Sequence, residues 1–145
     1  AELGVTKIVP YVSCRCVVKY KKEKGDKVLS RYQDILLEAS EQCKRNIVPE
    51  IVEPIKLSEL AKYCSDVNLL PYENAYGGAR YMSEIIDEKK SLTIVIGPEG
   101  GFSDEEVEEL KTAGFETVTL GSRILRAETA AMYACSVASE ILARK

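Results

Sequence analysis

Histidine is absent from the 145 residues of this chain. Its absence excludes a histidine general base, the Ser-His-Asp and Cys-His nucleophile arrangements, and zinc sites with histidine ligands, all within the chain itself. Catalysis by this chain would therefore depend on other side chains or on a bound cofactor.

A cysteine framework is missing as well, because the five cysteines are odd in number and form no CxxC pair. Neither a set of disulfides nor a zinc ribbon fits this pattern. Cys14 and Cys16 form a CxC, which would place both thiols on one face of a strand. A redox or metal pair is one interpretation of the CxC. We favour the other, which is small strand residues in a reducing cytosol, and we predict no metal site.

Long apolar runs are also missing. The longest, such as residues 93–97, are far shorter than the roughly 20 residues that a bilayer-spanning helix needs, and no basic and apolar leader precedes Ala1. We therefore expect a cytoplasmic protein with no membrane partner. The net charge is −3, which argues against indiscriminate nucleic-acid binding but is compatible with a local basic patch.

The chain does contain an alternation of short strands and amphipathic helices. This pattern predicts a single α/β domain with a largely parallel sheet. We expect a lysine-rich loop over 17–28, and we expect a short helix with Ser58 as its N-cap. The other expected elements are strands at 7–14, 51–54, 67–72, 92–97 and 115–120, and helices at 28–45, 104–113 and 127–143.

Two of the expected strands run directly into glycine-containing loops. The first loop is Gly97–Gly101, and the second loop is Gly121–Arg126. Ligands of parallel sheets bind beyond the carboxyl ends of the strands, so we expect a ligand at these loops. After the first loop, Ser103 and Glu106 predict a capping box at the start of a helix, and Gly114 predicts its end.

The first loop does not fit a phosphate group. It contains no lysine, it matches neither the P-loop nor the GxGxxG pattern, and Glu99 would repel a polyanion. A carboxylate there suits a cationic or neutral ligand. A nucleotide-phosphate enzyme of the ordinary doubly wound type is therefore disfavoured, although such glycines are often only structural.

Four segments, taken together, resemble one family. They are ELGVTKIVPYVSCR at 2–15, EQCKRNIVPEI at 41–51, GPEGGFSDEE at 97–106 and LGSRILRAETA at 120–130. In this order they are similar to the ribosomal RNA uridine-N3 methyltransferases of the SPOUT superfamily, the RsmE type. The resemblance implies a SPOUT-type α/β knot, a deep C-terminal trefoil around a mostly parallel sheet, which periodicity alone does not indicate.

The same resemblance implies S-adenosylmethionine as cofactor, N3 of a uridine in 16S ribosomal RNA as the methyl acceptor, and a two-fold homodimer that completes the site. It makes residues 1–145 a SPOUT methyltransferase domain. The N-terminal RNA-binding β-barrel of the family, and the first strand and helix of the knot domain, are expected to be absent from the chain. The last helix is expected at the dimer interface, through Ala131, Cys135, Ala138 and Leu142.

The site residues follow from matching the family motifs position by position. The resemblance assigns the cofactor to Leu70, Pro71, Gly97, Glu99, Gly100, Gly101, Leu120, Gly121, Ile124, Leu125, Arg126 and Thr129. It places polar residues near the RNA at Arg15, Glu41, Gln42 and Arg45. For catalysis we expect Arg126 or Arg45 to stabilise the developing uracil anion, and we consider Glu128 and Glu41 as groups that could remove the proton.

The charge distribution gives RNA binding some support of its own. Seven basic and two acidic side chains lie between Arg15 and Arg31, whereas residues 61–145 carry more acidic than basic groups. A basic lobe on an acidic body is typical of a surface that contacts an RNA backbone, although a solvated lysine loop explains the run equally well. The RNA-binding set expected on these grounds also includes Lys19, Lys21, Lys22 and Arg123.

A second function remains open from the sequence. A non-catalytic, dimeric RNA-binding or ribosome-assembly module could keep the same fold without the chemistry. A binding-only relative would be free to lose the first loop, and the presence of both complete loop motifs disfavours this alternative.

Overall fold

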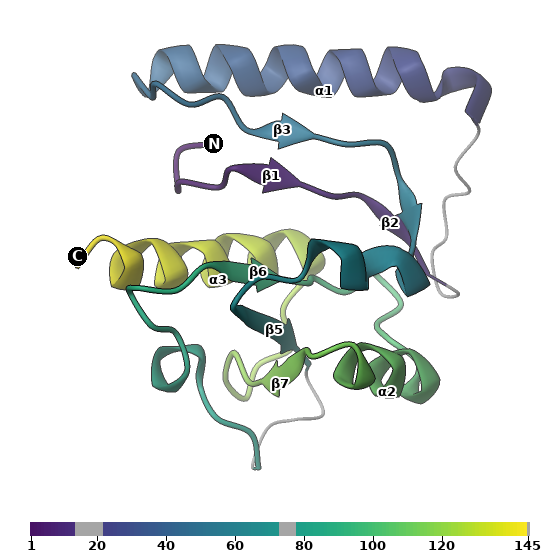
Figure 1. Ribbon diagram of the computed structural model, residues 1–145, viewed down its shortest axis with the longest axis vertical. Helices are drawn as coiled ribbons and strands as arrows, with labels where there is room; N and C mark the ends of the chain where they lie inside the picture. The colour runs from purple at the N-terminus through teal and green to yellow at the C-terminus, as the bar shows by residue number, and fades with distance from the viewer. Residues whose placement is uncertain (14–21, 73–77, 145) are drawn as a thin grey trace.

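Figure 1 shows the computed structural model of the chain, which describes residues 1–13, 22–72 and 78–144. Cys14, Cys16 and the expected RNA-binding residues Arg15, Lys19 and Lys21 lie outside the described residues, and only the backbone of Lys22 is described.

The described elements alternate between strands and helices, as the sequence predicts. The strands are β1 (Lys7–Ile8), β2 (Tyr11–Val12), β3 (Glu50–Ile51), β4 (Ile55–Lys56), β5 (Val67–Pro71), β6 (Leu92–Ile94) and β7 (Glu116–Val118). The helices are α1 (Lys22–Gln42), α2 (Asp104–Thr112) and α3 (Ala127–Leu142), with 3-10 helices η1 (Leu57–Tyr63) and η3 (Met82–Glu84). Every described strand pair is parallel: β1 with β3, β2 with β4, and β5 between β6 and β7. The α/β class with parallel sheets is thus confirmed.

The strand expected over 7–14 is divided into β1 and β2. Pro10 lies at the division, and it cannot donate a backbone hydrogen bond to a ladder. Its carbonyl accepts instead from the Ile55 amide at 3.0 Å, so the chain passes from one partner strand to the next. On the partner strands, Pro54 lies between β3 and β4 and likewise has no amide hydrogen to donate.

Helix α1 begins earlier than the sequence pattern suggests. The segment 17–28 was expected to be a loop, but the helix already includes Lys22 and passes through Gly25. Lysine and glutamate are good helix formers, and one internal glycine costs only about 1 kcal/mol. The helix also ends before the expected residue 45, because Lys44 has a positive φ of 60°. Figure 1 shows α1 along β3, on the side of the molecule away from α2.

The short helix η1 also differs from the expectation, because its N-cap is Lys56 and not Ser58. Leu57 and Leu60 are both buried in the core. Packing of these two leucines sets where the helix begins, and Ser58 lies inside the first turn.

The core lies on both faces of the central strand β5. Leu69 and Leu70 are adjacent and both have no exposed surface. Successive side chains of a strand point to opposite faces, so Leu70 packs with Phe102, Val107 and Leu110 on one face. Leu69 packs with α3 residues on the other face. Helix α2 and η1 therefore cover one side of the sheet, and α3 and η3 cover the other.

The ends of α2 match the sequence prediction. The Glu106 amide donates to Ser103 Oγ at 3.2 Å, and the Ser103 amide donates to Glu106 Oε1 at 3.0 Å. Phe102 and Val107 pack in the same cluster, and Gly114 follows the helix with φ of 109°. The capping box and the terminal glycine are both confirmed.

Helix α3 begins at the expected residue, Ala127, and ends at Leu142, one residue before the expected end. Ala134, Ala138 and Ile141 are buried in the core of the chain itself. Ala138, one of the residues expected at a dimer interface, thus packs within its own subunit, and the interface itself stays a prediction. The exposed apolar side chains of α3 are Met132 (60% exposed) and Tyr133 (43%).

Among the described residues, no helix is long and apolar enough to cross a membrane.

Candidate functional site

A cavity of about 590 Å³ lies beyond the carboxyl ends of the three-stranded sheet. Pro71 and Tyr72 border it at the end of β5. The first loop borders it after β6, and the second loop borders it after β7. Its volume is within the range of small-molecule sites, and its position is the one at which parallel sheets bind ligands. The two loops singled out from the sequence thus line one cavity.

Most residues expected to hold the cofactor line this cavity. They are Pro71, Gly97, Glu99, Gly100, Gly101, Leu120, Gly121, Ile124, Leu125 and Arg126, and Arg123 and Glu128 join them. Leu70 and Thr129 are not part of the lining. Leu70 is fully buried because its side chain points into the core face of β5.

The first loop is a tight turn with two specific glycine requirements. The Gly101 amide donates to the Pro98 carbonyl at 2.9 Å, and Gly101 has φ of 74°, a conformation that favours glycine. Gly97 is required for a different reason. A Cβ on Gly97 would lie 3.1 Å from Cε2 of Phe102, so the ring packs directly against the backbone.

The second loop is fixed at both ends. At its start, Gly121 has φ of 109° and donates its amide to Thr119 Oγ1 at 3.0 Å. At its end, Arg126 is the N-cap residue of α3 with extended backbone, and its carbonyl accepts from Ala130 at 2.8 Å. Arg126 itself is one of the residues that line the cavity.

Four charged side chains of the described residues, two basic and two acidic, line the cavity and form no ion pair with one another. Arg123 and Arg126 come from the second loop, Glu99 from the first loop, and Glu128 from the first turn of α3. None of the ion pairs in the described part of the chain joins these four side chains. An ion pair of Arg126 with Glu99 or Glu128, which would give the arginine a purely structural role, is not formed.

Arg45 lies elsewhere and contacts the backbone. Its Nη1 donates to the carbonyls of Ala1 at 2.7 Å and of Val5 at 3.0 Å. These contacts lie on the amino side of β1, and Arg45 does not line the cavity. Glu41 and Gln42 are exposed at the end of α1 and do not line it either. The expected catalytic set is thus divided: Arg126 and Glu128 are at the cavity, and Arg45 is not.

The sequence pattern missed several residues that border or support the cavity. Tyr72, Ile96 and Phe102 line it and flank the recognised motifs, so their position next to a glycine loop was a usable signal. Tyr11 gave no such signal. Its hydroxyl donates to the Ile96 carbonyl at 2.5 Å across 85 positions of sequence.

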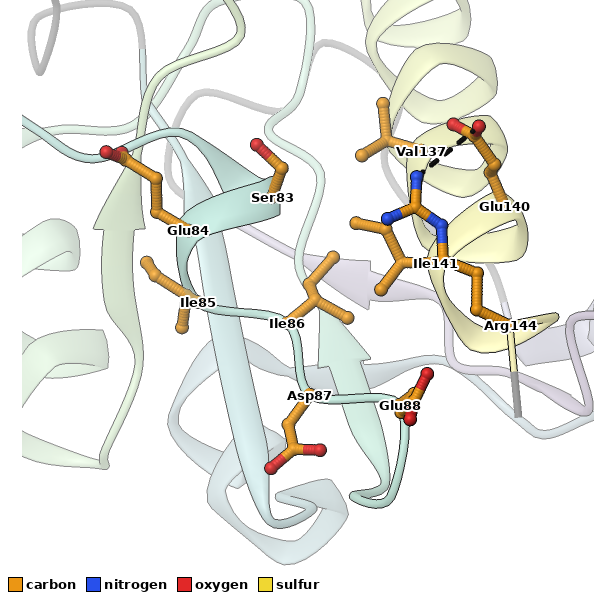
Figure 2. A pocket seen from close by; sticks show the side chains of 10 residues that line it. All are labelled: Ser83, Glu84, Ile85, Ile86, Asp87, Glu88, Val137, Glu140, Ile141 and Arg144. Atoms are coloured by element: carbon orange, nitrogen blue, oxygen red, sulfur yellow. Dashed lines mark ion pairs between the residues drawn. The ribbon is translucent and has the colours of Figure 1, made fainter.

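A second cavity of about 550 Å³ lies between residues 83–88 and the end of α3. Glu84, Asp87 and Glu88 border it, and Figure 2 shows Arg144 directed towards Glu140, which it pairs with at 3.5 Å. No residue assigned from the sequence lines this cavity. Within the described residues, no group of three or more histidine, cysteine, aspartate or glutamate side chains could hold a metal ion. The cavity at the two loops is therefore the candidate site.

Comparison with known families gives a match over almost the whole chain. The model of an RNA methyltransferase domain matches residues 1–139. The chain is 38% identical to ribosomal RNA small subunit methyltransferase E of Mesomycoplasma hyopneumoniae, over 91% of this chain and 57% of that protein. It is 37% identical to the protein of the same name from Bacillus subtilis, over 95% of this chain and 57% of that protein. The chain thus spans little more than half the length of these relatives.

Solved structures show the same similarity. A Legionella pneumophila methyltransferase in complex with SAM has a TM-score of 0.87 and 36% identity, over 96% of this chain and 57% of that one. A Neisseria gonorrhoeae ribosomal RNA small subunit methyltransferase E bound to S-adenosylmethionine has a TM-score of 0.84 and 36% identity, over 97% of this chain and 56% of that one.

Proposed function

The chain belongs to the RNA methyltransferase domain family, and from this premise we propose that it transfers a methyl group from S-adenosylmethionine to small-subunit ribosomal RNA. The acceptor in this proposal is N3 of a uridine in the 16S RNA. The observation that carries the proposal is the cavity formed jointly by the first and second loops at the carboxyl ends of β5, β6 and β7. Similarity to two methyltransferases with bound SAM supports it.

The residues of the cavity fit this cofactor. Glycine backbone at Gly97, Gly100 and Gly101 allows a ligand to approach closely. The Glu99 carboxylate is compatible with the positive sulfonium, and no lysine is present among the lining residues to attract a phosphate instead. Apolar side chains of both loops can pack against the adenosine. The cofactor supplies an electrophilic methyl group when it is bound.

The chemistry required of the chain itself is limited. Uridine N3 carries a proton, and its removal leaves negative charge shared with the neighbouring carbonyl oxygens of the ring. The guanidinium of Arg126, unpaired within the described residues, has fixed donors that suit such an oxygen. We assign Arg126 to stabilisation of this charge and Glu128 to removal of the proton. Positioning and electrostatics then supply most of the rate, with no histidine needed.

The RNA-binding proposal retains the residues that the sequence assigned. The structure adds the positions of two of them, Arg123 and Arg45. Arg123 lines the cavity and can contact RNA phosphate next to the target base. The contacts of Arg45 with two backbone carbonyls argue against a catalytic role for it. A ribosomal substrate is consistent with a cytoplasmic protein.

A homodimer and a C-terminal knot are part of the same proposal. Met132 and Tyr133 form an exposed apolar pair on α3, one turn beyond the cavity residues Ala127 and Glu128. Packing of this pair against its copy about a two-fold axis would bury it and bring a second subunit to the edge of the site. The knot is implied by the family resemblance.

Calorimetry with S-adenosylhomocysteine, together with methylation of purified small ribosomal subunits, tests the proposed function. We expect saturable binding of the ligand and transfer of labelled methyl groups to the RNA. Binding of RNA without binding of S-adenosylhomocysteine would support the binding-only module instead.

A further inference from the structure

Tyr11 contacts both ends of the first loop. Its hydroxyl donates to the carbonyl of Ile96 at 2.5 Å, immediately before Gly97. Its ring stacks on Phe102, immediately after Gly101, with centroids 6.3 Å apart and planes 10° from parallel. One side chain from a distant segment therefore holds both residues that flank the turn.

Ile96 lies beyond the end of β6 in the three-stranded sheet that precedes this loop. The Val95 amide donates to the Leu69 carbonyl at 3.0 Å, and Ile96 follows beyond the end of β6. Its carbonyl accepts from Tyr11, which belongs to the separate β2–β4 pair. The backbone of Tyr11 is itself in register with Ile55 of β4. The position of the loop is thus defined by contacts with two separate sheets.

The ring of Phe102 links Tyr11 to the backbone of the first loop. Phe102 is only 5% exposed, and its edge lies against the backbone of Gly97. A ring held by Tyr11 on one side and by the core on the other gives Gly97 little freedom. Close packing of this kind transmits small displacements of one group to its neighbours.

We propose that Tyr11 is a positioning residue for the cofactor loop, with its hydroxyl fixing the Ile96 carbonyl and thereby the placement of the backbone from Gly97 to Gly101. The inference rests on the proposed function, because it takes the first loop as part of the S-adenosylmethionine site. Tyr11 does not line the cavity, so it acts through the loop and not on the ligand.

The substitution Tyr11→Phe tests this role, because it removes the hydroxyl and keeps the ring that stacks on Phe102. Loss of one partly buried hydrogen bond changes an equilibrium constant by roughly three- to tenfold. We expect calorimetry to show the Kd for S-adenosylhomocysteine raised by about this factor, and steady-state methylation to show the KM for S-adenosylmethionine raised alike. We expect kcat to change less than KM.

The matched control is Tyr32→Phe, which removes a hydroxyl from a half-exposed side chain of α1. We expect this variant to bind S-adenosylhomocysteine as the wild type does. A Tyr11→Phe protein that melts at a lower temperature but keeps its Kd and KM within about twofold of wild type would show that Tyr11 has only a structural role, which would overturn the inference and leave the proposed function intact. Absence of S-adenosylhomocysteine binding by the wild type would overturn both.

Discussion

Gly97 and Phe102 pack so closely that any side chain at position 97 meets the ring. An added Cβ would lie 3.1 Å from Cε2 and 3.3 Å from Cδ2 of Phe102. The ring is buried in the core and cannot simply rotate away, so the loop would have to move. Gly97, which we propose allows a ligand to approach closely, is therefore also a packing requirement of the core beneath it.

This contact predicts that Gly97→Ala weakens cofactor binding. The first loop must shift by a few tenths of an ångström, which we expect to raise the Kd for S-adenosylhomocysteine by about tenfold. Isothermal calorimetry measures the change. Gly78→Ala is the matched control, since an added Cβ there meets nothing within 4 Å. Equal affinities for the two variants would contradict the prediction.

Gly101 provides a test based on backbone conformation. With φ of 74°, Gly101→Ala must adopt a left-handed conformation at a cost of about 1–2 kcal/mol. We expect both a lower melting temperature and a large loss of S-adenosylhomocysteine affinity, and we expect Gly101→Val to lose binding altogether.

Gly114→Ala separates the effect of Gly101→Ala on stability from its effect on ligand binding. Gly114 also has a positive φ, 109°, and has open space around it, but it ends α2 and does not line the cavity. Its variant should melt earlier and still bind the ligand normally. If Gly114→Ala loses affinity as Gly101→Ala does, the loss comes from general destabilisation and not from the loop.

Arg126 is predicted to affect turnover more than stability. Its side chain forms no ion pair within the described residues, so Arg126→Ala should melt close to wild type. Loss of a donor to the transition state lowers the rate by roughly a hundredfold or more. Methylation of ribosomal subunits and a thermal melt, performed side by side, distinguish the two roles.

The control for Arg126 is Arg80→Ala. Arg80 forms an ion pair with Glu116 outside the cavity, and we expect its loss to leave turnover unchanged, with at most a small effect on the melt. Near-normal turnover of Arg126→Ala with a lowered melting temperature would remove Arg126 from the chemistry.

Arg45 is predicted to behave in the opposite way. Arg45→Ala removes the charged donor to the carbonyls of Ala1 and Val5, and the Ala1 carbonyl keeps only its contact with the Gly4 amide. Hydrogen bonds from a charged donor contribute about 1.5–3 kcal/mol. We expect a fall of several degrees in melting temperature, with the affinity for S-adenosylhomocysteine unchanged. If Arg45→Ala instead keeps the wild-type melting temperature and loses turnover, Arg45 has the catalytic role that the sequence suggested.

Local patterns in the sequence predicted the parts of the structure that depend on local interactions. The capping box of Ser103 and Glu106 requires only residues three positions apart, and both glycine loops follow strands that the apolar runs identify. These patterns placed the two loops that line the cavity, and the family resemblance assigned the individual residues.

Features that depend on tertiary contacts could not be predicted in this way. The family resemblance assigned Arg45 to RNA or catalysis, and no local pattern in the sequence indicates that its partners are the carbonyls of Ala1 and Val5. Ser58 resembles an N-cap, but burial of Leu57 and Leu60 decides the start of η1. The contact of Tyr11 with Ile96 joins two sheets, and no local spacing indicates it.

The most direct test of the central claim is analysis of small-subunit ribosomal RNA after incubation with the protein and S-adenosylmethionine. Nucleoside mass spectrometry should detect one methyl group on N3 of a uridine in RNA from wild-type protein, and much less of it with Arg126→Ala. A methyl group at another atom, or S-adenosylhomocysteine binding without any transfer to this RNA, would contradict the account.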